Sequence, residues 1–147
     1  NEAVLAVADG ATEIDMVINI GELLSNNLLI VERDIAAVAK AVFGQALLKV
    51  IIETAYLSRE QIIDASKLCQ SAGADYVKTS TGFASSGAQL EHVRLMRDTV
   101  GSNFGVKAAG GISNRDVALA MIESGATRLG ASSGIAIVSG GEGSIGY

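Results

Sequence analysis

The sequence has no proline or tryptophan, a single cysteine, and 4% aromatic residues. One cysteine, Cys69, excludes an internal disulfide framework and a metal site built from several thiolates. It also makes a reducing cytoplasm the expected compartment. At a usage of about 5%, roughly seven prolines would be expected. We interpret their absence, together with Asn1 in place of methionine, as an indication that these residues are part of a longer protein.

Long apolar runs and clusters of basic residues are missing as well. The longest run without a charged residue is about 13 residues, and half of them are glycine or serine. A membrane-spanning helix needs about 20 mostly apolar residues, and no basic segment followed by an apolar one indicates a secretory signal. The net charge is −5 without any run of Lys or Arg. Neither a membrane nor a nucleic acid is therefore expected as a partner.

The pattern of apolar residues predicts strands alternating with helices. A hydrophobic content of 49% excludes a disordered segment and suits one ordinary domain. Apolar residues at helical spacing end at a glycine after each helix, and Ser58 with Gln61 and Ser113 with Asp116 are typical of helix starts. Short runs rich in β-branched residues predict strands over 13–18, 48–52, 75–79, 104–108 and 127–130.

Strands that alternate with helices form parallel sheets with right-handed crossovers. Five such units suit either an open, doubly wound sheet or part of a (βα)8 barrel. In the open sheet the glycine-rich loop usually follows the first strand. Here the glycine-rich segments follow the last three strands, which favours the barrel.

Charged residues interrupt three of the predicted strands. Asp15, Lys78 and Lys107 lie within apolar runs, where an ionised side chain is costly unless it is paired. Strand periodicity places Lys78 and Lys107 on corresponding faces, so a barrel would bring their ammonium groups together. Repulsion would lower the pKa of one lysine, and a partly neutral lysine can attack a carbonyl to form an imine. We interpret Lys49 as structural, because its position at the start of its strand places it at the opposite end from this chemistry. Glu53, which ends the same strand, could orient Lys78 or Lys107 by charge.

Segments rich in glycine and hydroxyl groups follow the last three predicted strands. Backbone N–H groups at glycines, side-chain hydroxyls and helix N-termini all favour bound anions. Because these loops follow the lysine-bearing strands, they predict a phosphate pocket beside the two ammonium groups. No dinucleotide or P-loop motif is present. The chemistry requires neither a metal nor an organic cofactor.

Five segments together resemble the deoxyribose-phosphate aldolase family: EIDMVINIGELL (13–24), LKVIIETAYLS (48–58), ADYVKTSTGF (74–83), VKAAGGI (106–112) and RLGASSG (128–134). The resemblance covers essentially the whole chain. It implies a (βα)8 barrel and a class I aldolase. Such an enzyme reversibly cleaves 2-deoxy-D-ribose 5-phosphate to D-glyceraldehyde 3-phosphate and acetaldehyde, through a lysine Schiff base and without a cofactor.

The resemblance also implies roles for individual residues. Lys78 matches the imine-forming lysine, Lys107 the second lysine that perturbs it and transfers protons, and Asp15 the acid/base aspartate. Thr79 matches a position beside the substrate, and Tyr147 a C-terminal tyrosine associated with proton transfer. The residues that match the phosphate-binding loops are Gly82, Gly110, Gly111, Gly130, Ser132 and Ser133.

In that family the barrel begins with three further strand–helix units. We therefore expect residues 1–147 to form one partial aldolase domain that supplies strands four to eight. The resemblance further implies a cytoplasmic homo-oligomer, a dimer at full length, that acts in deoxyribose phosphate catabolism. Two alternatives remain: another Schiff-base aldolase of the transaldolase type, and a non-catalytic, phosphate-binding barrel fragment.

Overall fold

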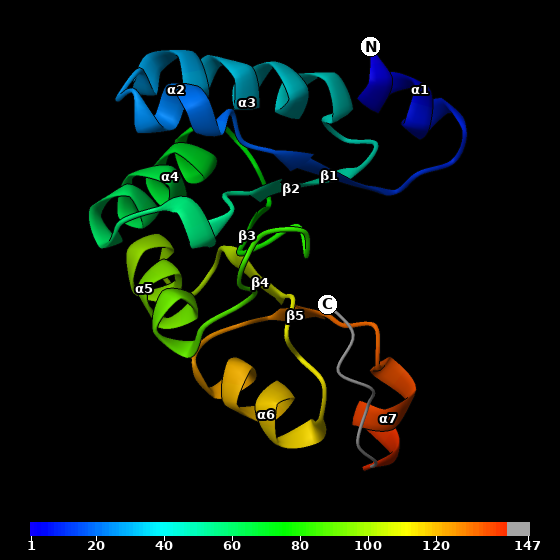
Figure 1. Ribbon diagram of the computed structural model, residues 1–147. Coiled ribbons are helices and arrows are strands. Elements are labelled where there is room, and N and C mark those ends of the chain that lie inside the picture. The colour runs from blue at the N-terminus through cyan, green and yellow to red at the C-terminus, as the bar shows by residue number, and fades with distance from the viewer. Residues whose placement is uncertain (141–147) are drawn as a thin grey trace.

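The computed structural model describes residues 1–140, and a parallel sheet of five strands forms their centre (Figure 1). The strands are β1 (Glu13–Val17), β2 (Leu47–Ile51), β3 (Tyr76–Lys78), β4 (Gly105–Ala109) and β5 (Arg128–Gly130). Within residues 1–140, each strand pairs with its neighbours along the chain, in the order β1-β2-β3-β4-β5. A doubly wound sheet reverses its strand order at a switch point. The sequential order is that of a (βα)8 barrel, of which this chain forms a part.

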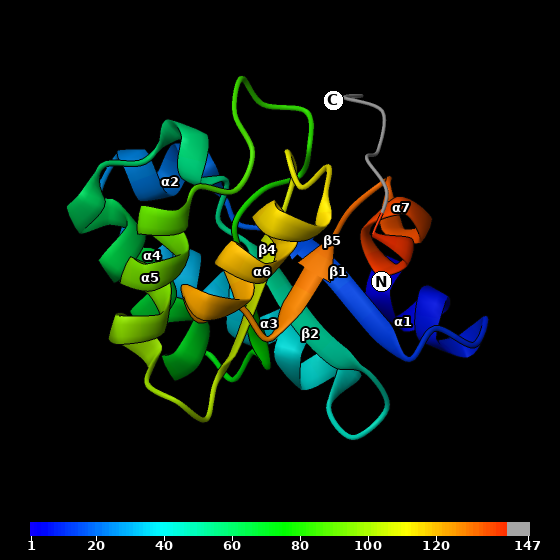
Figure 2. The ribbon, with the colours of Figure 1, turned by 90° about the horizontal axis from the view of Figure 1, so that it is seen from below.

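The helices lie mainly on one side of the sheet. In Figure 1 the helices α2 (Ile20–Leu24) to α6 (Arg115–Glu123) follow its convex side, whereas α1 (Glu2–Ala8) and α7 (Gly134–Ser139) lie beyond its two edges. The remaining helices are α3 (Leu28–Val42), the 3-10 turn η1 (Thr54–Tyr56), α4 (Arg59–Ser71) and α5 (Leu90–Val100). Figure 2 shows the loops that follow β3 and β4 together at one end of the sheet.

Alternate residues of the strands point to the two faces of the sheet, and the convex face carries the core. Leu48, Val50, Val77, Val106 and Ala108 point towards the helices, and none of them is more than 1% exposed. Full burial of a Val or Leu side chain stabilises the fold by about 1.5–3 kcal/mol. Most of the stability of the sheet therefore comes from its convex face.

The predicted helix boundaries are largely confirmed. Ser58 accepts a hydrogen bond from the Gln61 N–H, and the Gln61 side chain accepts one from the Ser58 N–H, which is the predicted capping box. The predicted start of α6 is wrong by one residue. Asn114, not Ser113, is the N-cap, and its side chain accepts from Val117 N. Asn is as good an N-cap as Ser, so the sequence alone does not choose between neighbours.

Candidate active site

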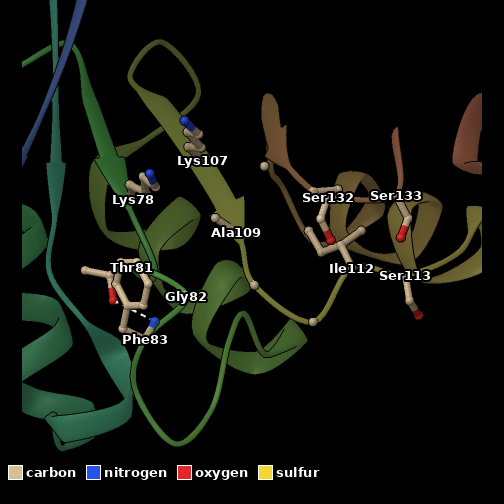
Figure 3. Close-up of a pocket in the computed structure, with 14 residues that line it drawn as sticks. Lys78, Thr81, Gly82, Phe83, Lys107, Ala109, Ile112, Ser113, Ser132 and Ser133 are labelled. Carbon is tan, nitrogen blue, oxygen red and sulfur yellow. Dashed lines mark hydrogen bonds between the residues drawn. The ribbon is translucent and has the colours of Figure 1, made fainter. Parts of the chain in front are cut away.

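Three charged side chains meet on the concave face of the sheet. Asp15 comes from β1, Lys78 from β3 and Lys107 from β4. Asp15 Oδ2 accepts hydrogen bonds from Lys78 Nζ at 2.7 Å and from Lys107 Nζ at 3.3 Å. Lys78 and Lys107 are direct neighbours in the register of β3 and β4 (Figure 3). The structure therefore brings together the three residues that interrupt the predicted strands.

The two lysines repel each other, and the carboxylate between them offsets this repulsion. Because both nitrogens contact the same oxygen, they lie no more than about 6 Å apart, where their repulsion at an effective dielectric of about 20 amounts to about 3 kcal/mol. The side chains of Lys78 and Lys107 are only 11% and 15% exposed. Water therefore screens this repulsion poorly, and Asp15 is needed to hold both ammonium groups in place.

Lys49 belongs to the same cluster, contrary to the prediction from the sequence. Its Nζ donates to Asp15 Oδ1 at 2.9 Å and lies 2.8 Å from Glu13 Oε2. The register explains the error, because β2 begins at Leu47 and Lys49 lies directly opposite Asp15 in the middle of both strands. Lys49 is 2% exposed. It is therefore a buried ammonium group that fixes the second oxygen of the Asp15 carboxylate.

The cluster continues to the far edge of the sheet. Arg128, on β5, donates from both terminal nitrogens to the two oxygens of Glu13 at 3.1 Å. This pair joins the first and last strands, and the guanidinium also lies over the Tyr76 ring. A Cβ at Gly105 would collide with that ring. Only glycine therefore leaves room for Tyr76 beneath the charged residues.

These contacts shift the pKa values of the site in opposite directions. Burial disfavours the Asp15 carboxylate, but hydrogen bonds from Lys78 and Lys49 outweigh it and hold the pKa of Asp15 well below its usual range. Burial, followed by the charge of Lys78, lowers the pKa of Lys107. The pKa of Lys49 is raised, because hydrogen bonds to Glu13 and Asp15 outweigh its burial. Asp15 is therefore ionised at neutral pH, and of these three groups only Lys107 is shifted towards losing its proton.

A pocket of about 320 Å³ opens beside the lysines at the carboxyl ends of β3, β4 and β5 (Figure 3). Lys78 and Lys107 line it, together with Gly82, Gly110, Gly111, Gly130, Ser132 and Ser133 from the predicted phosphate loops. Its other lining residues are Thr81, Phe83, Ala109, Ile112, Ser113 and Ala131. The glycine- and serine-rich segments after three strands therefore form one cavity with the lysines, as the sequence indicated.

Close backbone contact shapes this pocket. A Cβ on Gly87 would lie 2.4 Å from the carbonyl oxygen of Gly110. The neighbouring Ala88 N–H donates to the carbonyl oxygens of Ala109 and Gly110 at 3.1 and 3.0 Å. Gly110 itself has a φ of +85°, which side chains rarely allow. The loop after β3 is therefore joined to the loop after β4 through glycine.

Thr79 and Tyr147 are the two predicted site residues that the pocket and the charged cluster do not account for. Thr79 does not line the pocket, although the resemblance implied a position beside the substrate. It is completely buried, and its hydroxyl donates to the Ala109 carbonyl at 3.2 Å and accepts from the Ala109 N–H at 3.1 Å. It therefore joins β3 to β4 behind the lysines. Tyr147 lies outside the described residues.

Glu53 does not orient a lysine. Its carboxylate accepts hydrogen bonds from the backbone N–H of Thr81 at 3.3 and 3.2 Å, and a further one from the Thr81 hydroxyl. Within residues 1–140, no cationic group lies within 4.0 Å of this carboxylate. The role by charge that the sequence suggested is therefore wrong. The contact with Thr81 was not foreseen, because it depends on an unusual turn after β2.

Two further observations concern cofactors and membranes. Among the described residues, no three His, Cys, Asp or Glu side chains are grouped so that they could hold a metal ion. No helix within residues 1–140 is long and apolar enough to cross a membrane.

Cys69 is fully buried in α4, and burial raises the pKa of its thiol. The thiol is therefore protonated and unreactive at neutral pH.

Comparisons with known proteins give a consistent result. Residues 1–140 match the family described as DeoC/LacD family aldolase. The chain is 60% identical over 142 residues to deoxyribose-phosphate aldolase 1 of Oceanobacillus iheyensis. This alignment covers 97% of this chain and 64% of that relative. It is 57% identical over 142 residues to deoxyribose-phosphate aldolase of Enterococcus faecalis, with the same coverage. The chain thus spans about 64% of the length of these curated relatives.

A solved structure described as "QR15, an Aldolase" superposes with a TM-score of 0.89 at 45% identity, covering 94% of this chain and 62% of that one. The tetrameric deoxyribose phosphate aldolase from Aeropyrum pernix superposes with a TM-score of 0.83 at 31% identity, covering 94% and 58%. The alignments therefore extend over nearly all of this chain and over about three fifths of each solved structure.

Proposed function

The chain belongs to the DeoC/LacD family of aldolases, and from this premise we propose that it carries the active site of a deoxyribose-phosphate aldolase. The reaction is the reversible cleavage of 2-deoxy-D-ribose 5-phosphate to D-glyceraldehyde 3-phosphate and acetaldehyde. One observation carries the proposal: two lysines on neighbouring strands share one carboxylate oxygen at the edge of a glycine- and serine-lined pocket. Both lysines lie on the concave face, whereas the apolar core lies on the convex face.

Lys78 is the proposed nucleophile. Its neutral amine attacks the C1 aldehyde of the open-chain sugar, and loss of water gives a protonated imine. The imine withdraws electrons, so the C2–C3 bond breaks when a base removes the proton of the C3 hydroxyl. D-glyceraldehyde 3-phosphate leaves, and the two-carbon enamine is protonated at C2. Hydrolysis of the resulting imine then releases acetaldehyde and regenerates the lysine.

Lys107 and Asp15 are the proposed proton carriers. Burial and the charge of Lys78 lower the pKa of Lys107, so it gives up a proton more readily than an exposed lysine does. The ionised Asp15 contacts both nitrogens through one oxygen, which provides a path for a proton between them. Lys49 holds the other oxygen of the carboxylate. In this mechanism Lys49 positions Asp15 and does not contact the substrate.

The substrate phosphate is proposed to bind at the loops that follow β3, β4 and β5. Their residues Gly82, Gly110, Gly111, Gly130, Ser132 and Ser133 line the pocket together with the two lysines. Backbone N–H groups and serine hydroxyls can bind an oxyanion without arginine, and the nearby ammonium groups favour an anionic substrate. The phosphate thus anchors the sugar at one end while its aldehyde reaches Lys78 at the other.

The proposal concerns a barrel larger than the described sheet. Two apolar residues of the concave face are partly exposed: Val17 of the edge strand β1 by 46% and Leu47 of the neighbouring strand β2 by 39%. We propose that three further strand–helix units complete the barrel and cover these residues. The remaining expectations, a cytoplasmic enzyme of deoxyribose phosphate catabolism that forms dimers, belong to the same proposal.

Trapping of the imine tests this function. Full-length protein is incubated with acetaldehyde and reduced with borohydride, and the modified peptide is identified by mass spectrometry. An ethyl group on Lys78 and release of acetaldehyde from deoxyribose 5-phosphate are expected. A protein that instead transfers ketose fragments and ignores acetaldehyde is a transaldolase-type enzyme. A protein that binds phosphate but forms no adduct with any aldehyde is not catalytic.

A further inference from the structure

We propose that Glu53 is a positioning residue that fixes the lip of the pocket, which consists of Thr81, Gly82 and Phe83. The expected changes in KM rest on the proposed function, whereas the expected changes in hydrogen exchange do not. Glu53 lies directly after β2, outside the group of charged side chains around Asp15. Among the described residues, its carboxylate is bound through Thr81 alone, and Thr81 in turn determines where the pocket-lining residues Gly82 and Phe83 lie.

The environment of Glu53 is unusual for a structural residue. The residue is only 3% exposed. Its φ and ψ are 54° and 66°, a left-handed conformation that residues other than glycine rarely adopt. A buried carboxylate needs compensation, and here the compensation consists of hydrogen bonds from Thr81 without a cation among the described residues. A strained backbone and a buried charge at one residue are typical of functional sites.

The hydrogen bonds form a chain from Glu53 to the pocket. The Thr81 N–H and hydroxyl both donate to Glu53. The Thr81 hydroxyl oxygen also accepts from the Phe83 N–H at 3.1 Å, the hydrogen bond that Figure 3 draws. The Thr81 hydroxyl is thus already engaged on both sides. Its role is to transmit the position of Glu53 to Phe83. Gly82, between them, has a φ of +99°, which allows the turn that faces the pocket.

The rest of the loop is held by other contacts. At its start, Thr79 is hydrogen-bonded to Ala109, and at its end Ala88 donates to Ala109 and Gly110. Between these two points, Phe83 is 88% exposed within the part of the chain that the structure describes, so little packing supports it there. Glu53 therefore provides the contact that holds the lip, including Gly82 of the predicted phosphate loops, at the pocket.

The test compares Glu53→Ala, Glu53→Gln and Thr81→Val in the full-length protein. Asp75→Ala is the matched control, because Asp75 also accepts a backbone hydrogen bond, from Leu48 N at 2.8 Å, but at the opposite end of the strands. We expect Glu53→Ala to raise the KM for deoxyribose 5-phosphate by about tenfold with a smaller change in kcat, since the lysines are untouched. The KM for unphosphorylated deoxyribose should change by less than about threefold, because Gly82 of the lip belongs to the predicted phosphate loops.

The amide variant should keep most of the affinity for deoxyribose 5-phosphate that Glu53→Ala loses. Glu53→Gln keeps an oxygen that can accept from the Thr81 N–H. Thr81→Val should reproduce the loss of Glu53→Ala, and the double variant should be no worse than either single one. Equal losses for both sugars, or the same loss in Asp75→Ala, would overturn the positioning role and leave a purely structural one.

A measurement without substrate separates this proposal from the proposed function. Hydrogen exchange at the Thr81 and Phe83 amides should become about tenfold faster or more in Glu53→Ala, and it should stay unchanged in Asp75→Ala. If the wild-type protein forms no imine but this difference is found, the proposed function fails and the positioning role of Glu53 stands. Unchanged exchange at both amides contradicts the positioning role whatever the activity.

Discussion

The two faces of the sheet use the same strands for different purposes. On the convex face, Val50, Val77 and Val106 are completely buried under helices. Each of these valines has a lysine as a direct neighbour in the chain that points to the concave face. These lysines, Lys49, Lys78 and Lys107, meet at one aspartate. Because side chains alternate along a strand, stability and chemistry can be changed independently at neighbouring positions. Activity and stability should therefore separate cleanly between the two faces.

The largest effect should come from Lys78. Replacing it by alanine removes the only amine proposed to form the imine, so borohydride trapping with acetaldehyde should fall below detection. Turnover should drop by at least about a thousandfold. Mass spectrometry of the reduced protein provides the measurement. An adduct on Lys107 or Lys49 in the wild type would assign the nucleophile to a different strand.

Asp15 should connect the two properties, because it is the concave residue on which three lysines depend. The fold lowers the pKa of Asp15. The ionised carboxylate therefore stabilises the folded state at pH values above the unfolded pKa of about 3.9. This stabilisation is lost as the pH falls through the lower pKa of the folded state. In Asp15→Asn, turnover should fall about a hundredfold.

The urea midpoint of Asp15→Asn should lie below that of the wild type at pH 7, and the difference should shrink as the pH falls from about 5 towards 2. A difference that is constant over this range would mean that the carboxylate does not stabilise the fold through its charge.

Ser132 tests the polar rim of the concave side. Ser132→Asp places a negative charge in the region proposed for the phosphate. The affinity for deoxyribose 5-phosphate should fall by about tenfold or more, and that for unphosphorylated deoxyribose by much less. The KM values of the two sugars give the comparison, with Ser132→Ala as the uncharged control. Similar losses for both sugars would place the phosphate elsewhere.

Val77 should give the smallest effect on activity. It precedes Lys78 but points to the convex face, where it is fully buried. Val77→Ala should lower the free energy of unfolding by about 2 kcal/mol because it leaves a cavity. Turnover per folded molecule at 25 °C should remain within about twofold of the wild type. Urea denaturation and a turnover assay measure the two quantities. A large loss of turnover would show that the two faces are not independent.

The parts of the molecule that the sequence predicts are those governed by local rules. Strand alternation and helix periodicity are local, so the five strands and the capping box at Ser58 follow from neighbouring residues. The adjacency of Lys78 and Lys107 follows from parallel strands of equal pattern. The resemblance to known aldolases added the proposed roles, which spacing could not supply.

The parts that were missed depend on contacts between distant segments. Lys49 was placed at the wrong end because the register of β2 against β1 is set by packing and not by residues 48–52 alone. Glu53 adopts a left-handed turn that its residue type disfavours, so nothing local indicates its bond to Thr81. Arg128 lies 115 positions from its partner Glu13. Such pairs appear only when the whole sheet has curved.

The strand order has a consequence for the time course of folding. Every strand pairs with its neighbour in the chain, so most of the sheet can form by adding one unit after another, each at a modest loop-closure cost. The contact between Lys107 and Asp15, by contrast, spans 92 positions. Contacts of such separation form late, because they require the ordered segments between them. The charged centre should therefore be the last part of this segment to assemble, after the helices already cover the opposite face of the sheet.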